Sequence, residues 1–383
     1  MKITKPLLVL GTRPEAIKMA PVIRECRRRP DIDPVVCFTG QHREMVAQVA
    51  EYFEISADVN LDLMRPNQTL ASLTSRCIDG LDEAIRSHNP DCVVGQGDTT
   101  TVMTASMVAF YHRIPFVHVE AGLRTGDMYA PWPEEFNRRV AGLVAGLHCA
   151  PTRKSADNLI REGVPARQVH VTGNTVIDAL LWAIDRERDN SAHWAARYPQ
   201  LCRPRMVLIT GHRRENFGDG FSSICRAIAH LGKEFADVDF IYPVHLNPNV
   251  SGPVNETLGN LPNIHLVPPA SYPEFVWLMD KADLILTDSG GVQEEAPSLR
   301  KPVLVMRETT ERPEAVDAGA VELVGASCEG IIRSVSRLLQ DADEYFRRQI
   351  DSNPYGNGDS AAQIADLIVA HAWETTAPVR IAV

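Results

Sequence analysis

The stretch 92-CVVGQGDTTTVMTASMVAFYHRIPFVHVEAG-122 contains two short apolar runs with a longer segment between them. The runs end in Gly97-Asp98 and Glu120-Ala121-Gly122, and the segment 99–110 is predicted to be a helix. Because both runs are continuously apolar rather than alternating, they favour strands of a parallel sheet with helices on both faces. The stretch therefore predicts a strand, a helix and a second parallel strand, which is a βαβ unit.

Similar runs recur on both sides of this unit, and each ends in Gly, Pro, Asp or Thr. They are 7-LLVLG, 35-VVCFTG, 147-LHCAPT and 169-VHVTG in the first half, and 206-MVLITGH, 238-VDFIYPVH, 264-IHLVPP, 283-DLILTDSGG, 303-VLVMRE and 321-VELVG in the second. The pattern predicts an α/β protein with two doubly wound domains, one after the other. We place the boundary near Thr172-Gly173-Asn174, although the polar stretch 185–204 is the alternative.

Composition narrows the class of protein. The 383 residues suffice for two or three domains at roughly 150 residues each, and the contents of 44% hydrophobic and 23% charged residues are those of a globular chain. The net charge of −10 argues against a nucleic-acid or membrane-surface binder. The apolar run 7–10 is too short for a signal peptide, so we expect a cytoplasmic protein. The eight cysteines lack metal-ligand spacing and are predicted to be reduced packing residues, with no metal site.

Carboxylates follow several predicted strands of the first half. Asp98 and Glu120 stand at strand ends, and Glu134 lies in a strand-exit loop. Ligands of open α/β sheets bind beyond the carboxyl ends of the strands, so these three groups are expected to converge. Their mutual repulsion would raise the pKa of at least one and place an acid beside a base. The alternative for Asp98 is a helix N-cap.

Cations occur in the loop 11-GTRPEAIK, where Arg13 and Lys18 would flank the start of a helix. Free backbone N–H groups and two cations make an anion site there, with a solvated helix start as the alternative. The loop lacks both the G-x-x-x-x-G-K and the G-x-G-x-x-G pattern. It is therefore neither a Walker loop nor a dinucleotide fingerprint.

The second half has its own polar strand exits. His212 and Arg213 follow one strand and His245 another; a solvated turn and a hydrogen-bonded core histidine are the respective alternatives. In 287-DSGGVQEE, the Ser289-Gly290-Gly291 turn exposes backbone amides that can face a diphosphate. Glu295 could accept the hydroxyls of a ribose or complement the helix dipole, and Arg312 adds a cation.

Nine motifs in order closely resemble the bacterial non-hydrolysing UDP-N-acetylglucosamine 2-epimerase family. They are 11-GTRPEAIKMAPVI, 97-GDTTT, 118-HVEAGLRTGD, 131-PWPEEFNRR, 173-GNTVIDALLW, 210-TGHRREN, 242-YPVHLNP, 287-DSGGVQEEAPSL and 309-TTERPEAV. The resemblance runs from about residue 7 to 320. It implies two Rossmann-like domains in a glycosyltransferase-B-type arrangement. The C-terminal helix would return to the first domain, so the domains would be 1–172 with 360–383, and 173–359.

The resemblance also implies roles for individual residues. Those around the sugar and in catalysis are Arg13, Lys18, Asp98, Glu120, Glu134 and His212. Those that bind the substrate's UDP are Phe275, Ser289, Gly290, Gly291, Glu295 and Arg312, with Arg213 also in contact with substrate. Some members have a regulatory UDP-N-acetylglucosamine pocket, whose residues match Gln41, His42, Gln68, Arg213 and His245. Glu44 and Asn67 stand where regulated members carry Gln and Arg.

The implied reaction is reversible epimerisation at C2 of UDP-N-acetylglucosamine to UDP-N-acetylmannosamine. UDP would be eliminated to leave a 2-acetamidoglucal and then added back, without a cofactor. A homodimer that supplies N-acetylmannosamine-type precursors for cell-surface polysaccharide is expected. A retaining glycosyltransferase and a hydrolysing epimerase that releases the free sugar are the alternatives. A catalytically silent nucleotide-sugar sensor is a third, which the presence of all three carboxylates disfavours.

Overall fold

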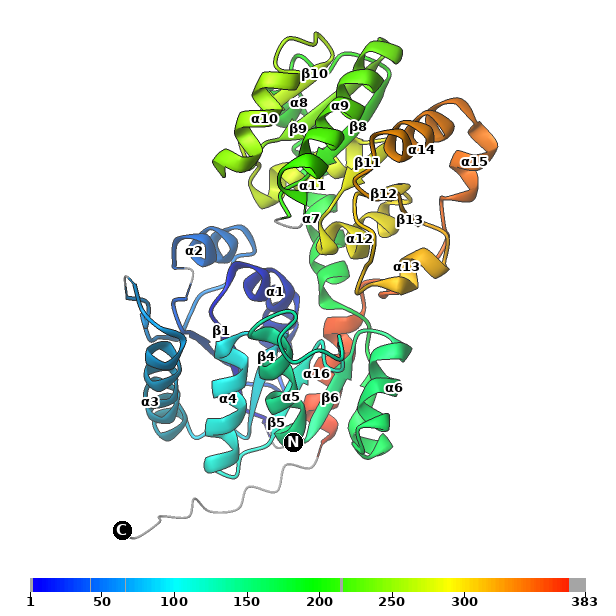
Figure 1. Cartoon of the computed structure of the whole chain (residues 1–383). Helices are drawn as coiled ribbons and strands as arrows, with labels where there is room; N and C mark the ends of the chain where they lie inside the picture. Colours follow the sequence, from blue (N-terminus) through cyan, green and yellow to red (C-terminus); the bar gives the residue numbers. More distant parts are fainter. Residues whose placement is uncertain (1–2, 42, 66, 214–215, 372–383) are drawn as a thin grey trace. The chain divides into compact units, whose positions relative to one another are not determined.

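The structure is a computed structural model that describes residues 3–41, 43–65, 67–213 and 216–371 (Figure 1). The chain forms two compact units: unit 1 is Met1–Ala179 with Tyr355–Val383, and unit 2 is Leu180–Pro354. Helix α7, Thr175–Asp189, crosses the division. Each unit contains one parallel sheet with helices between its strands, so the predicted two-domain α/β fold is confirmed.

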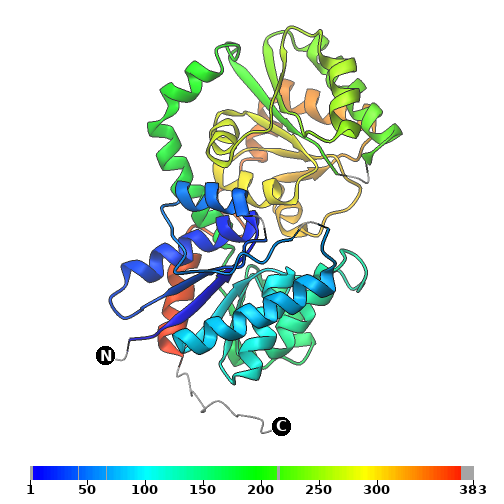
Figure 2. The same ribbon diagram turned by 90° about the vertical axis from the view of Figure 1, so that its left-hand side faces the viewer.

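Unit 1 is built on a seven-stranded parallel sheet with the order β3-β2-β1-β4-β5-β6-β7. Its elements are β1 (Pro6–Leu10), α1 (Arg13–Arg28), β2 (Val35–Phe38), α2 (Arg43–Tyr52), β3 (Val59–Asn60), α3 (Leu70–His88), β4 (Cys92–Gln96), α4 (Thr100–Tyr111), β5 (Phe116–Val119), α5 (Glu134–Val144), β6 (Leu147–Ala150), α6 (Arg153–Arg161), β7 (Val169–Val171) and α16 (Ser360–Ala370). Helices α3, α4 and α5 pack together on one face, and α1, α2 and α16 form the other layer (Figure 2). The C-terminal helix α16 packs against α1, and Arg29 forms an ion pair with Asp366.

Unit 2 has a six-stranded parallel sheet with the order β10-β9-β8-β11-β12-β13. Its elements are α8 (Ser191–Arg197), β8 (Arg205–Thr210), α9 (Asp219–Glu234), β9 (Val238–Pro243), α10 (Pro248–Leu258), β10 (Ile264–Val267), α11 (Tyr272–Lys281), β11 (Leu284–Thr287), α12 (Gly290–Glu295), β12 (Val303–Val305), α13 (Pro313–Asp317), β13 (Val321–Leu323), α14 (Cys328–Gln340) and α15 (Ala342–Arg347). A hydrophobic core of unit 2 lies between the sheet and helices α9, α10 and α14.

The strand order of each sheet reverses once, and these reversals position the candidate residues. In unit 1 the reversal lies between β1 and β4, whose exits carry Gly11 and Asp98. In unit 2 it lies between β8 and β11, whose exits carry His212 and Asp288. Such switch points open a crevice beyond the carboxyl ends of the strands. Four of the polar loops singled out from the sequence, those after β1, β4, β8 and β11, therefore lie at the switch points.

The remaining expectations concern cysteines, metals and membranes. All eight cysteines are free thiols, most of them buried, and burial raises the pKa of Cys26, Cys37 and Cys149 to about 12. Among the described residues, no group of three or more His, Cys, Asp or Glu side chains could hold a metal ion. No helix in the described part of the chain is long and apolar enough to span a bilayer.

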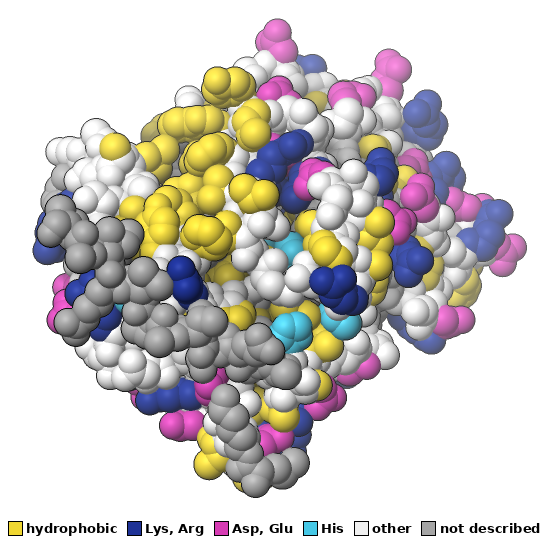
Figure 3. Space-filling view, turned by 90° about the horizontal axis from the view of Figure 1, so that it is seen from below, with side chains coloured by type: hydrophobic (Ala, Val, Ile, Leu, Met, Phe, Trp, Pro, Cys, Tyr) yellow, Lys and Arg dark blue, Asp and Glu magenta, His cyan; other side chains and the backbone are white. Residues whose placement is uncertain are grey.

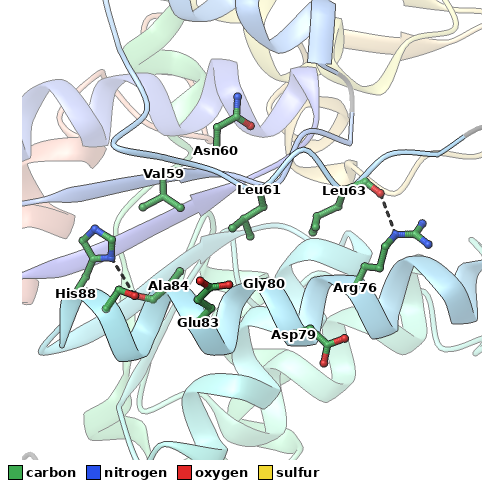
Figure 4. Close-up of a pocket in the computed structure, with 11 residues that line it drawn as sticks. Val59, Asn60, Leu61, Leu63, Arg76, Asp79, Gly80, Glu83, Ala84 and His88 are labelled. Carbon is green, nitrogen blue, oxygen red and sulfur yellow. Dashed lines mark hydrogen bonds between the residues drawn. The ribbon is translucent and has the colours of Figure 1, made fainter.

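Two cavities of unit 1 lie away from the exits of β1, β4 and β5. One, of about 540 Å³, runs between α3 and residues 59–63, where Arg76 Nε donates to the carbonyl of Leu63 over 3.1 Å (Figure 4). The other, of about 600 Å³, is lined by α6, β7 and α16. None of the residues proposed for catalysis or substrate binding lines either cavity.

Candidate active site

Glu120 follows β5 directly and is almost fully buried. Lys18, from α1, donates to both of its carboxylate oxygens over 2.7 Å, and Gln96, the last residue of β4, donates to one of them. The backbone of Glu120 is left-handed, with φ of 60°, which a non-glycine residue seldom adopts. Strained positions of this kind cluster at active sites. The charged pair with Lys18 and the bond from Gln96 hold the carboxylate in one orientation.

Asp98 lies at the exit of the neighbouring strand β4, after Gly97, whose φ is 83°. Arg138 from α5 donates to its carboxylate, and Asn137 Nδ2 donates to its backbone carbonyl over 2.9 Å. The N-cap of α4 is Thr99, which accepts a bond from the backbone N–H of Val102, so the N-cap alternative for Asp98 is wrong. The carboxylate of Asp98 is instead oriented by the hydrogen bond from Arg138.

The two adjacent glutamates on α5 differ in their surroundings. Glu135 is fully buried and accepts bonds from Arg138, Arg139 and the backbone N–H of Thr125. Glu134, at the first position of the helix, is half-buried, and its carboxylate makes no hydrogen bond or ion pair with any described residue. Glu135 therefore stabilises the loop and helix, whereas Glu134 presents an unengaged carboxylate.

The first loop holds Arg13 but does not leave its amides free. Thr12 and Glu15 form a capping box, in which Glu15 accepts bonds from the N–H groups of Gly11 and Thr12 over 2.8 and 2.7 Å. Burial raises the pKa of Glu15, and bonds from Thr99, Gly11 and Thr12 oppose this effect. The anion site expected here therefore lacks those two N–H donors. Arg13 itself is half-buried and forms no ion pair with a described residue.

His118 is a buried residue of β5 that supports the Asp98 loop. Its Nε2 lies 2.7 Å from the carbonyl oxygen of Gly97, and Nδ1 has no hydrogen-bond partner among the described residues. Because a carbonyl only accepts, Nε2 carries a proton, and burial lowers the pKa to about 4, so the ring is neutral. His118 thus fixes the residue that precedes Asp98.

We expect unit 1 to lose stability as the pH falls from 6.5 towards 4. His118 and its cross-strand neighbour His148 have pKa values lowered by burial from 6.5 to about 4 and about 3. The unfolded chain therefore binds protons in this range and the folded chain does not, which favours unfolding. Urea unfolding followed by circular dichroism between pH 7 and 4.5 measures the effect. The variant His148→Asn, which does not titrate, should show a shallower decline; an identical decline would contradict the assignment.

In unit 2, Asp288 and His212 meet at the switch point. Asp288 is fully buried, and its Oδ2 accepts bonds from the backbone N–H groups of His212 and Arg213, each over 2.8 Å. The His212 ring stacks on that of His245 with centroids 5.6 Å apart. Burial lowers the pKa of His212, Asp288 raises it, and Arg213 and His245 lower it further. Arg213 Nε is buried without a hydrogen-bond partner in the described part of the chain.

The glycine turn precedes α12 and lies against Arg312. A Cβ on Gly290 would come 2.7 Å from an Nη atom of Arg312, and a Cβ on Gly291 would come 3.3 Å from Glu295 Oε1. Arg312 Nε donates to buried Glu294 over 2.6 Å. The missing side chains therefore leave room for backbone amides, a guanidinium and a carboxylate to lie close together. Phe275 is half-buried on α11.

The residues matched to a regulatory pocket are only partly described. Gln41 Oε1 accepts a bond of 3.4 Å from Thr101 Oγ1, and Gln68 Oε1 accepts bonds from Arg76 and the N–H of Arg65. His42 lies outside the described residues. Gln68 is thus already engaged by cationic and backbone donors.

Several supporting residues escaped the sequence analysis. They are Glu15, Gln96, His118, Arg138 and Asp288. Two signals were available: Thr12 and Glu15 have the T-x-x-E spacing of a capping box, and Glu134 and Arg138 are four residues apart on a predicted helix, which places them on one face. The pairings of Gln96, His118, Arg138 and Asp288 join segments that are distant in the chain, so no local spacing shows them.

Comparisons with known proteins agree on one family. A family profile described as UDP-N-acetylglucosamine 2-epimerase matches residues 24–369. A protein of Salmonella typhimurium named UDP-N-acetylglucosamine 2-epimerase is 52% identical over 371 residues, which cover 96% of this chain and 99% of the relative.

Solved structures of similar proteins extend the match to the fold. The UDP-GlcNAc 2-epimerase of Neisseria meningitidis, bound to UDP-GlcNAc, has a TM-score of 0.89 and 46% identity and covers 96% of this chain and 100% of its own. That of Methanocaldococcus jannaschii, in complex with UDP-GlcNAc and UDP, has a TM-score of 0.79 and 32% identity, with coverage of 96% and 100%. The chain therefore belongs to the UDP-N-acetylglucosamine 2-epimerase family, a family of isomerases.

Proposed function

We propose that the protein interconverts UDP-N-acetylglucosamine and UDP-N-acetylmannosamine by inverting C2 of the sugar. The observation that carries the proposal is the carboxylate group of unit 1, with Glu120 held by Lys18 and Asp98 held by Arg138 at the exits of paired strands. Family membership and the relatives solved with UDP-GlcNAc or UDP support the choice of substrate.

The chemistry follows from the weak acidity of the C2 proton. Removing it without a redox cofactor requires a leaving group on the neighbouring carbon, and UDP at C1 is that group. We propose that UDP leaves to form a 2-acetamidoglucal and then adds back while a proton reaches the opposite face of C2. Two proton-transfer groups are needed on opposite faces, and Asp98, Glu120 and Glu134 supply the candidates. Glu134 is the unengaged member of this set.

Unit 2 supplies the groups that hold UDP in this proposal. Departing UDP carries the negative charge that develops as the C1–O bond breaks. His212, Arg213 and Arg312 would stabilise this charge through charge-assisted hydrogen bonds, aided by the amides of Gly290 and Gly291. Glu295 would accept the ribose hydroxyls and Phe275 would contact the base end of the nucleotide. Holding UDP also keeps it available for addition to the glucal.

One experiment tests the proposed reaction. Proton NMR of UDP-N-acetylglucosamine with the protein in deuterium oxide should show deuterium entering C2 together with signals of the manno epimer. Free N-acetylmannosamine with stoichiometric UDP would instead identify a hydrolysing epimerase. Absence of an epimer and of C2 exchange would contradict epimerisation and favour a transferase that requires an acceptor. We also propose that the product enters cell-surface polysaccharide synthesis in the cytoplasm.

We propose that the protein forms a homodimer through the packed helices α4 and α5. These helices expose Phe110, Tyr111, Phe136 and Leu143, the last with 86% of its surface accessible. Figure 3 shows that apolar side chains gather on part of the surface of the molecule. Large exposed apolar patches mark protein interfaces. Leu143→Glu should shift the mass measured by light scattering from dimer to monomer. Ile160→Glu, on α6, is the matched control; a dimer that survives Leu143→Glu would contradict the assignment.

We propose that regulation by a second UDP-N-acetylglucosamine is weak or absent. Asn67 is uncharged and Glu44, in the first turn of α2, adds a negative charge that repels a diphosphate. Gln41, His42, Gln68, Arg213 and His245 nevertheless remain. The reverse reaction from UDP-N-acetylmannosamine alone should therefore start without a lag. A long lag that trace UDP-N-acetylglucosamine abolishes would show that the pocket works despite Asn67 and Glu44.

A further inference from the structure

Asp288 uses only one of its two carboxylate oxygens for the backbone. Oδ2 accepts the two N–H bonds from residues 212 and 213, whereas Oδ1 is fully buried and has no hydrogen-bond partner in the described part of the chain. A buried, unpaired carboxylate oxygen costs free energy unless a donor reaches it. The nearby nitrogen is Nδ1 of His212, at 3.5 Å from Oδ1. A shift of about 0.5 Å would bring this nitrogen within the usual range of a hydrogen bond to Oδ1.

The surroundings restrain the ring in this position. His245, after β9, stacks on the His212 imidazole with an angle of 16° between the ring planes. Tyr242, within β9, donates its hydroxyl to the carbonyl of Gly211 over 2.9 Å and so holds the residue before His212. The His212 side chain is 44% exposed while Asp288 is fully buried. Part of the His212 side chain thus packs against the protein, and the rest remains accessible to a ligand.

We infer that Asp288 is the positioning residue for His212, with its buried Oδ1 accepting Nδ1–H and leaving Nε2 for the substrate. The pair resembles other carboxylate–histidine pairs, in which the carboxylate selects the tautomer and stabilises the imidazolium. The inference rests on the proposed function for its turnover measurements only. It also explains why the charged side chain of Asp288 is buried although the reaction does not require it to contact UDP.

Burial and the charged groups around His212 together determine whether its pKa is raised or lowered. Among the described residues, Asp288 raises its pKa, whereas Arg213 and His245 lower it, and burial lowers it most. The negative charge of a bound diphosphate would favour the protonated ring. Asp288 would then share the imidazolium charge from the opposite side through Nδ1–H.

The first measurement needs no catalysis. Asp288→Asn keeps a side-chain oxygen for the two backbone N–H groups but removes the negative charge. NMR titration of the His212 ring in the free protein should show its pKa falling further below 6.5, with a change in the tautomer signature of the ring nitrogens. Asp239→Asn is the matched control, because Asp239 is also buried in unit 2 and lies 2.8 Å from a different histidine, His265. It should leave the His212 titration unchanged.

The second measurement is a double-mutant cycle on turnover. Asp288→Asn should lower kcat about 10-fold or more in the wild-type background but less than about 2-fold in a His212→Gln background. Equal losses in both backgrounds, or an unchanged His212 titration in Asp288→Asn, would overturn the inference. Thermal unfolding of each variant separates loss of fold from loss of positioning. If the wild type formed no epimer, the proposed function would fail while the titration still tested Asp288.

Discussion

Asp98→Asn, Glu120→Gln and Glu134→Gln are each expected to lower the rate of epimerisation about 100-fold or more, the usual contribution of an acid–base group. The amides keep the size and most hydrogen bonds of the carboxylates but cannot take up or deliver a proton. Measuring kcat of each variant in both directions of the reaction shows which carboxylate serves which face of C2. A variant that blocks only exchange of the gluco C2 proton identifies the group on that face.

Two controls separate catalysis from structure. Asp157→Asn removes an exposed carboxylate of α6 and should leave kcat unchanged. Gln96→Leu removes one donor to Glu120 but leaves Lys18, so it should reduce kcat less than Glu120→Gln. Turnover close to that of the wild type in all three carboxylate variants would rule out the proposed catalytic group.

Gly122→Ala is expected to destabilise unit 1 by at least about 3 kcal/mol. Gly122 follows the Glu120 loop with φ of 92°, and a Cβ there would lie 2.2 Å from the backbone oxygen of Ser155. Because that oxygen belongs to the backbone of α6, it cannot move aside as a flexible side chain would. The loop that carries Glu120 would therefore be displaced. Hydrogen exchange of β4 and β5 peptides, measured by mass spectrometry, reports the stability of unit 1 separately from unit 2.

Gly126→Ala distinguishes the two causes of this destabilisation. Its φ of 86° is similar, but nothing lies within 4 Å of a Cβ at that position. It should therefore cost only the backbone strain, about 1–2 kcal/mol. If the two variants destabilised unit 1 equally, the contact with Ser155 would not be the cause.

Local sequence pattern determined much of the architecture. The apolar runs with polar exits all form strands, and the alternation with helical segments predicted two parallel sheets. It missed β3, because two residues, Val59 and Asn60, are too few for a pattern. Apolar residues at 3- and 4-residue spacing over 329–350 suggest one helix, but the structure divides the segment at Asp341, which caps a separate helix, α15. The predicted domain bounds at 172 and 360 and the roles of the site residues stay predictions.

The amino-acid pattern shows which residues stand at strand exits, because a strand and the turn that ends it are local in the chain. Which of those exits meet follows from the three-dimensional fold, because strand order joins segments that are distant in sequence. Lys18 reaches Glu120 across 102 positions, and Asp288 reaches the His212 backbone across 76. Burial then decides their chemistry: His118 becomes neutral, and Glu135 becomes a structural group beside unengaged Glu134. Neither the partner nor the degree of burial is encoded in the spacing of residues along one element, and both set the charge that a side chain carries.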